Sequence, residues 1–184
     1  MAQVPVASST HLIWLDMEMT GLDVNKEVPI EVCAIVTDWK FQNLSEYHAV
    51  INQPKKYLDA MDKWNVKHHG ESGLLKLIPK GKNMSSVDDE LSGMIREYFG
   101  RDKAILAGNS IGQDRLFIEK YMPATEKCLH YRMLDVTSYK VVFNNLYGIK
   151  FKKKDAHRAV DDIHESIAEL QFYLNHFKLN PASR

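Results

Sequence analysis

Four carboxylates and one histidine stand along this chain in an order suited to metal-dependent hydrolysis: Asp16, Glu18, Asp114, His157 and Asp162. The apolar run at residues 12–15 leads directly into the first two acids, so the pattern predicts a buried strand that ends by presenting both. Side chains two positions apart on a strand project to the same face. Such a pair can ligate one divalent cation or bridge two, and its oxygen ligands favour Mg²⁺ or Mn²⁺.

An Asp-x-Glu pair alone is more often a solvated strand end, so the metal site depends on the other residues. Two cations about 3.5–4 Å apart, with a water in line, form a site that cleaves phosphodiesters. A histidine beside them can remove a proton from that water. Asp114 follows a predicted strand in the first turn of a predicted helix, where it either faces the crevice at the strand ends or interacts with the helix dipole.

The last predicted helix, residues 156–177, contains His157 close to two candidate acids. Residues four apart share a helix face, which would pair His157 with Asp161. Asp162, however, is aligned with the small residues Ala159 and Ser166, a surface that another group can approach closely. The pattern therefore favours Asp162 if His157 lies at the frayed start of the helix. The alternative for His157 is an exposed residue at the helix entry.

Alternating and helical apolar patterns separate well along the chain and predict the α/β class. Strands are predicted at residues 11–16, 30–37, 47–51, 104–107 and 129–134. Short connections make the first three strands antiparallel neighbours. The pattern is helical from residue 57 onward, with later helices at residues 85–98, 113–121, 136–147 and 156–177. The prediction is a mixed five-stranded sheet flanked by helices.

The length of 184 residues and the hydrophobic content of 45% are those of one globular domain. We expect this domain at residues 11–179, between a flexible N-terminal segment (1–10) and a C-terminal tail (180–184). Basic and acidic residues balance at 24 each, which argues against a protein that coats long nucleic acid by electrostatics. A nucleic acid substrate would therefore be short.

Cys33 and Cys128 are too few for a disulfide framework or a zinc site, and Cys33 is expected in a strand core. No apolar stretch approaches the length of a membrane span, and residues 1–10 lack the features of a signal or transit peptide. These observations predict a cytoplasmic protein without a membrane segment, or a mitochondrial one if a leader has been removed.

Five segments, taken together and in this order, resemble the DEDDh family of 3'-to-5' exonucleases and, within it, the oligoribonucleases. They are Leu15-Asp-Met-Glu-Met-Thr-Gly-Leu22, His69-Gly-Glu-Ser-Gly-Leu74, Gly108-Asn-Ser110, Tyr131-Arg-Met-Leu-Asp-Val136 and His157-Arg-Ala-Val-Asp-Asp-Ile163. Each motif alone is weak, whereas five in order are specific. The resemblance extends from Leu12 to about Leu179.

The resemblance implies a ribonuclease H-like fold, a homodimer, and a 3'-to-5' exoribonuclease that releases 5'-mononucleotides from very short RNA, with dinucleotides preferred. It also implies that two Mg²⁺ or Mn²⁺ ions are the cofactors and that the four acids hold them: Asp16, Glu18, Asp114 and Asp162. His157 would be the general base that activates water.

Substrate contacts are implied by the same resemblance. Leu22 would wedge between two bases, Trp64 and His69 would line the base and phosphate pocket, and the 5' phosphate would be bound by Ser110, Arg132 and Thr137. Tyr131 would reach over from the other subunit. Bacterial members often have serine at the position of Thr137, so here an added methyl group must fit.

Each of these residues also has a structural alternative. In this alternative, Leu22 would be an ordinary apolar loop residue and Trp64 a core anchor, and Tyr131 and Arg132 would be alternating positions on an edge strand. Two rival functions stay open as well. The first is a DEDDh exonuclease acting on longer RNA or DNA; the second is a non-catalytic binding module, which is disfavoured because all five catalytic positions are filled.

Overall fold

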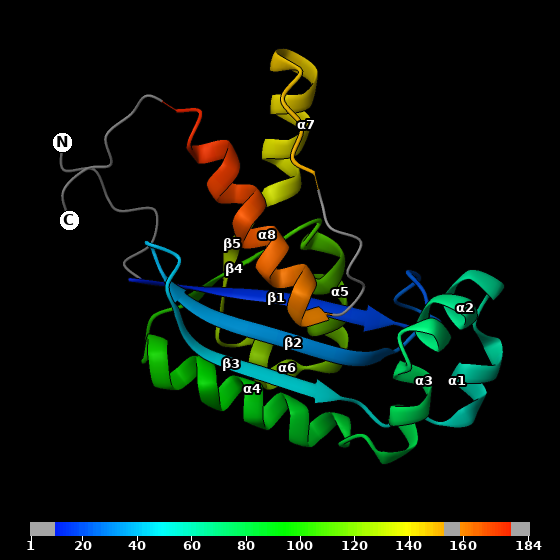
Figure 1. Cartoon of the computed structure of the whole chain (residues 1–184). Helices are drawn as coiled ribbons and strands as arrows, with labels where there is room; N and C mark the ends of the chain where they lie inside the picture. Colours follow the sequence, from blue (N-terminus) through cyan, green and yellow to red (C-terminus); the bar gives the residue numbers. More distant parts are fainter. Residues whose placement is uncertain (1–9, 153–158, 178–184) are drawn as a thin grey trace.

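A mixed five-stranded sheet forms the centre of the computed structural model, which describes residues 10–152 and 159–177 (Figure 1). Its strands, in the order β3-β2-β1-β4-β5, are β1 (His11–Met19), β2 (Pro29–Asp38), β3 (Asn43–Val50), β4 (Ala104–Gly108) and β5 (Leu129–Asp135). The first three are antiparallel neighbours, whereas β4 runs parallel to β1 and β5 parallel to β4. The predicted α/β class and the mixed sheet with an antiparallel start are confirmed.

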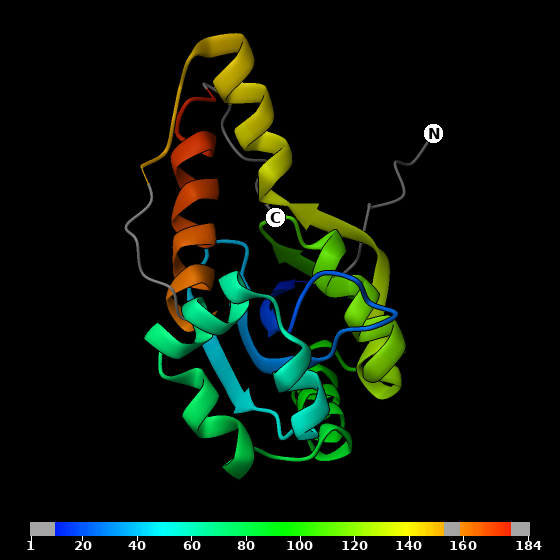
Figure 2. The ribbon, with the colours of Figure 1, turned by 90° about the vertical axis from the view of Figure 1, so that its right-hand side faces the viewer.

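Helices cover both faces of this sheet (Figure 1). They are α1 (Lys55–Ala60), α2 (Lys63–Glu71), α3 (Leu74–Leu77), the 3-10 helix η1 (Ile78–Lys80), α4 (Met84–Phe99), α5 (Gly112–Tyr121), α6 (Pro123–Glu126), α7 (Val136–Tyr147) and α8 (Ala159–Leu174). Helix α8 crosses one face of β1 and β2, and α4 lies against the other face. Helix α7 extends away from the sheet beside α8 (Figure 2).

Strand β1 is buried on both faces, which explains why its sequence is a nearly continuous apolar run. Ile13 and Leu15 face the core formed with α4 and α5. Leu12 and Trp14 face the core formed with α8. Because successive side chains alternate, the positions after Trp14 on the α8 face are 16 and 18, so the core packing itself directs both acids toward α8.

Several element boundaries differ from the predictions, and β1 continues to Met19 rather than ending at residue 16. Strand β3 begins at Asn43 rather than at residue 47, because its first part pairs with β2 through the backbone and carries mostly exposed polar side chains. Helix α8 ends at Leu174, before the predicted residue 177. The short helix α6 was not predicted. Parts of the predictions lie outside the described residues: His157, residues 156 and 158 of the predicted helix, the segment 1–9 and the tail 180–184.

Both cysteines are unpaired, and Cys33 is fully buried in β2 as expected for a residue in a strand core. Within residues 10–152 and 159–177, no helix combines the length and the apolar character that a membrane span requires.

Candidate active site

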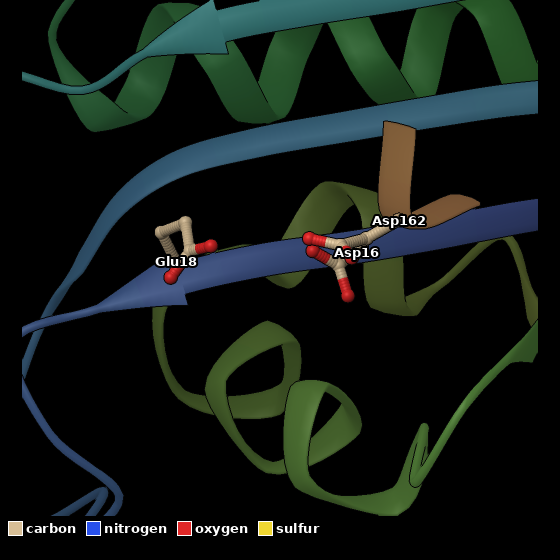
Figure 3. A group of neighbouring side chains, drawn as sticks. All are labelled: Asp16, Glu18 and Asp162. Carbon is tan, nitrogen blue, oxygen red and sulfur yellow. The ribbon is translucent and has the colours of Figure 1, made fainter. Parts of the chain in front are cut away.

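Three carboxylates from two elements meet near the C-terminal end of β1 (Figure 3). Asp16 and Glu18 leave β1, and Asp162 reaches them from the first turn of α8. One carboxylate oxygen from each lies within 4.8 Å of the others, and all three residues are half-buried. This spacing is short enough for a single cation to contact all three side chains.

Asp114 lies in the first turn of α5 and is buried beneath the end of β1. Its Oδ1 accepts a hydrogen bond of 3.0 Å from the backbone N–H of Met17, the residue between the two acids of β1. In β1, only Ile13 and Trp14 pair with β4. Met17 lies beyond this pairing, and the carboxylate of Asp114 provides the hydrogen-bond acceptor for its N–H group. It also lines the same cavity as Asp16 and Glu18.

Gly108, the last residue of β4, explains how these elements approach one another. A Cβ at this position would lie 2.8 Å from the carbonyl oxygen of Leu15, so only glycine allows the end of β4 to pass so close to β1. The chain then turns at once into α5. A larger residue would move α5, and with it Asp114, away from the acids of β1.

Burial of negative charge dominates the electrostatics of the site. Burial, followed by the charges of the neighbouring carboxylates of Glu31 and Asp162, raises the pKa of Glu18 to about 7. The pKa of Asp114 is also raised to about 7: burial is the main cause and the charge of Glu18 adds to it, while hydrogen bonds from backbone N–H groups, that of Met17 among them, act in the opposite direction. Groups held in this way need a proton or a cation. The clustered oxygen donors therefore fit divalent metal ions.

Only one of the two adjacent acids of α8 enters the cluster. Asp162 is half-buried beside Asp16 and Glu18, whereas Asp161 is exposed. Ser166 lies one turn further along the same face, and its hydroxyl donates to the backbone oxygen of Asp162 at 2.8 Å. The small-residue face that favoured Asp162 in the sequence is thus the face that meets the acids of β1.

A cavity of about 230 Å³ opens beside the acids. Leu22, from the loop between β1 and β2, and Trp64, from α2, line it although these side chains are 73% and 67% exposed. The exposure of Trp64 excludes the alternative that it is a core anchor. A larger cavity of about 540 Å³ lies between α4 and α6, but none of the predicted site residues lines it.

Trp64 and His69 occupy opposite sides of α2. The indole of Trp64 stacks on the imidazole of His68, with ring centroids 4.7 Å apart and ring planes 11° from parallel. His69 is buried behind Glu18: its Nε2 donates to the carbonyl oxygen of Met19 at 3.0 Å, and its Nδ1 lies 3.8 Å from a Glu18 oxygen. Burial lowers the pKa of His69.

Ser110 and Thr137 are brought together at the start of α7. The backbone N–H of Ser110 donates to the hydroxyl oxygen of Thr137 at 2.8 Å, and the two hydroxyl oxygens lie 3.1 Å apart. Asp135 accepts hydrogen bonds from the backbone N–H groups of both residues. Ser110 has a φ of 51°, a left-handed conformation that directs the chain from β4 into α5. The cavity beside the acids includes Ser110 in its lining.

Tyr131 and Arg132 stand on β5, an edge strand of the sheet. The side chain of Tyr131 is 72% exposed, and the guanidinium carbon of Arg132 lies 4.9 Å from the centroid of its ring. Neither residue lines the cavity beside the acids. Within the described part of a single chain, these two predicted residues are therefore not gathered with the carboxylates.

Two residues near the site were not predicted from the sequence. Glu31 is buried on β2 directly opposite Glu18, and its carboxylate lies 2.7 Å from the Nε2 of His48. Its signal was a single acid inside the otherwise apolar run of residues 29–36. Gln113 lines the cavity from α5, next to Asp114, and no motif or periodicity indicated its contacts.

Known proteins resemble this chain in sequence and in fold. Residues 13–170 match the protein family described as exonuclease. The oligoribonuclease of Francisella tularensis subsp. tularensis is 43% identical over 171 residues, which cover 90% of this chain and 95% of that protein. The oligoribonuclease of Ectopseudomonas mendocina is 40% identical over 176 residues, which cover 91% and 96%.

Among solved structures, E. coli exonuclease I in complex with a dT13 oligonucleotide has a similar fold, with a TM-score of 0.66 at 16% identity. The match covers 90% of this chain but only 41% of the exonuclease I chain. At this identity the similarity concerns the fold. It agrees with the ribonuclease H-like architecture expected from the sequence motifs.

Proposed function

The chain belongs to the oligoribonuclease family of exonucleases, and on this premise we propose that it is a 3'-to-5' exoribonuclease that hydrolyses very short RNA to 5'-mononucleotides, with dinucleotides as preferred substrates. The observation that carries the proposal is the cluster of three carboxylates from β1 and α8 beside a small cavity. The cavity places the exposed side chains of Leu22 and Trp64 beside these acids, where the terminal bases of a short RNA could bind.

Divalent cations fit the carboxylates of this site, and we assign two, Mg²⁺ or Mn²⁺, to Asp16, Glu18, Asp114 and Asp162. When bound, they supply positive charge for the phosphate oxygens and for the leaving 3' oxygen. The chain itself holds these acids in place before substrate arrives: the sheet fixes the two on β1, and the hydrogen bond to Met17 fixes Asp114.

His157 is proposed as the general base that removes the proton from the attacking water. It lies outside the described residues, and its support is its place in the chain, two residues before α8 begins and five before Asp162. A base acts in its neutral form, so turnover should rise as the pH rises through the pKa of this imidazole.

Recognition of the substrate ends is proposed for two groups of residues. The exposed apolar side chains of Leu22 and Trp64 flank the cavity and offer stacking surfaces for bases. The paired hydroxyls of Ser110 and Thr137, together with the forked donor of Arg132, would bind the 5' phosphate. His69 is assigned an indirect part, because its side chain is buried behind Glu18 and does not line the cavity.

A homodimer is proposed to complete the phosphate end of the site with Tyr131 of the second copy. Exposed apolar side chains support this: Tyr131 and Met133 on the edge strand β5, and Val141, Val142, Leu146 and Tyr147 on the projecting helix α7. Apolar groups of this number are rarely left in water together, and a second copy of the chain would cover them. We also propose a cytoplasmic location.

A length series of 5'-labelled RNA and DNA tests the proposal. Turnover of a diribonucleotide that requires added Mg²⁺ or Mn²⁺ and falls steeply for longer strands is the expected result. Equal processing of a diribonucleotide and a long strand would favour an exonuclease of broader substrate range. Full turnover in the presence of a chelator would contradict the metal-dependent reaction.

A further inference from the structure

The loop between β1 and β2 presents Leu22 at the cavity, ahead of a turn at residues 23–27 that is closed by its own backbone hydrogen bonds. The base of the loop is closed by a hydrogen bond of 3.0 Å from the backbone N–H of Thr20 to the oxygen of Val28. Leu22 lies beyond this closure, with its side chain 73% exposed. Packing of the side chain into the core therefore contributes little to fixing its position.

Helix α5 supports the loop through three side chains that donate to its carbonyl oxygens. The Nε2 of Gln113 donates to Leu22 at 2.7 Å, the Nζ of Lys120 donates to Val24, and the hydroxyl of Tyr121 donates to Glu27 at 2.7 Å. Positions 113, 120 and 121 are seven and eight residues apart, so they lie on one face of the helix. The donors thus follow the loop along one side of α5.

The same helix carries Asp114, which is bonded to the backbone of β1 between the two acids of that strand. Gln113 and Asp114 are adjacent, and both line the cavity together with Leu22. One turn of α5 therefore links the carboxylate site to Leu22, which lines the same cavity. The distance available to a substrate between these points depends on that turn.

We propose that Gln113 is a positioning residue that sets where Leu22 stands relative to the carboxylates, and thereby the length of RNA that the site accepts. The inference rests on the proposed function. The hydrogen bond from Gln113 is made to the carbonyl oxygen of Leu22 itself. It restrains the backbone of this residue, so the Leu22 side chain moves only by changing its rotamer. Without this bond, α5 holds the loop only at Val24 and Glu27, so Leu22 can move away from the acids and admit a longer substrate.

The test uses Gln113→Met, which keeps the length of the side chain but removes the donor, and Gln113→Glu, which replaces the donor by an acceptor. Lys120→Met is the matched control, because it removes a donor to the same loop at Val24, which does not line the cavity. Loss of one hydrogen bond corresponds to roughly a fivefold effect. Both Gln113 variants should raise KM for a diribonucleotide about fivefold, with a smaller change in kcat, and should weaken the preference for a diribonucleotide over longer RNA.

Amide hydrogen exchange of the loop, measured without substrate, separates this inference from the proposed function. Exchange near Leu22 should be faster in both Gln113 variants than in the wild type, whereas Lys120→Met should affect mainly the amides around Val24. Unchanged exchange near Leu22 together with unchanged KM in Gln113→Met would overturn the positioning role, as would an equal loss of length preference in Lys120→Met. If even the wild type fails to cleave diribonucleotides, the proposed function falls, and the exchange data still decide whether Gln113 holds the loop.

Discussion

Without bound cations, the stability of this fold should fall as the pH rises, because Glu18 and Asp114 keep their protons longer in the folded chain than in the unfolded chain. Burial, reinforced by neighbouring acids, raises the pKa of Glu18 from 4.5 to about 7, and burial raises that of Asp114 from 3.8 to about 7. On unfolding, both groups return to their ordinary values. Between about pH 4 and pH 7 the unfolded chain binds fewer protons, so stability is lost as the pH rises through this window.

The size of the effect follows from the same pKa values. Each unit of pKa corresponds to about 1.4 kcal/mol, so ionisation costs the folded state about 3 kcal/mol at Glu18 and about 4 kcal/mol at Asp114. The two costs are not additive, because the charge of Glu18 contributes to the raised pKa of Asp114. For a chain of this size, 1 kcal/mol shifts Tm by about 2–4 °C, so Glu18 alone accounts for roughly 10 °C.

Thermal unfolding of chelator-treated protein at pH 5 and pH 8 measures this loss. Glu18→Gln cannot ionise, so its decrease in Tm between the two pH values should be about 5–10 °C smaller than that of the wild type, because part of the cost is already present at pH 5. His69 acts in the opposite direction: its pKa is lowered, so its contribution to stability is lost as the pH falls through its ordinary range. This contribution is shared by both proteins and largely cancels in their difference.

Added Mg²⁺ or Mn²⁺ should restore much of the lost Tm of the wild type at pH 8 and less of that of Glu18→Gln, because binding to the folded state alone stabilises it. An identical pH dependence of Tm in the two proteins would show that ionisation of Glu18 does not cause the loss.

Three further outcomes are expected. Asp162→Asn should lower turnover by about 100-fold or more, whereas Asp161→Asn, which changes an exposed side chain beside it, should stay within about twofold of the wild type. His157→Ala should lower kcat by about 10²–10⁴-fold while calorimetry shows unchanged metal binding, and undiminished turnover would exclude it as the base. Leu146→Asp should convert the proposed dimer to a monomer in light scattering, with Leu77→Asp, another exposed leucine, as the control; a monomer with full activity would contradict the role of Tyr131.

The acid cluster could be predicted because strand and helix periodicities act over short distances in the sequence. Two-residue spacing placed Asp16 and Glu18 on one face of β1, and the alignment with Ser166 selected Asp162 over Asp161. The sheet followed from the same patterns. Helix α6 could not be predicted, because its start is stabilised by Asp88, a residue distant in the sequence. The Asp88 carboxylate accepts hydrogen bonds from the N–H groups of Ala124 and Thr125.

Burial at the cavity was equally beyond prediction from the sequence. Trp64 and His69 are both in α2, and nothing in the pattern indicates that the larger aromatic residue is 67% exposed while the histidine is buried. The side of α2 that faces β1 decides this, since the imidazole of His69 donates to the carbonyl of Met19. A contact between distant segments thus determines which side chain is left to meet a substrate.

Glu31 adds negative charge near the site although it is not one of the candidate metal ligands. The register of β1 and β2 places it directly opposite Glu18, on the same side of the sheet, and its charge raises the pKa of that carboxyl. His48, on β3, pairs with Glu31 and keeps this buried acid hydrogen-bonded within the sheet. The negative charge that favours divalent cations therefore extends from β1 to β2, and the part on β2 depends on the pairing register rather than on any motif.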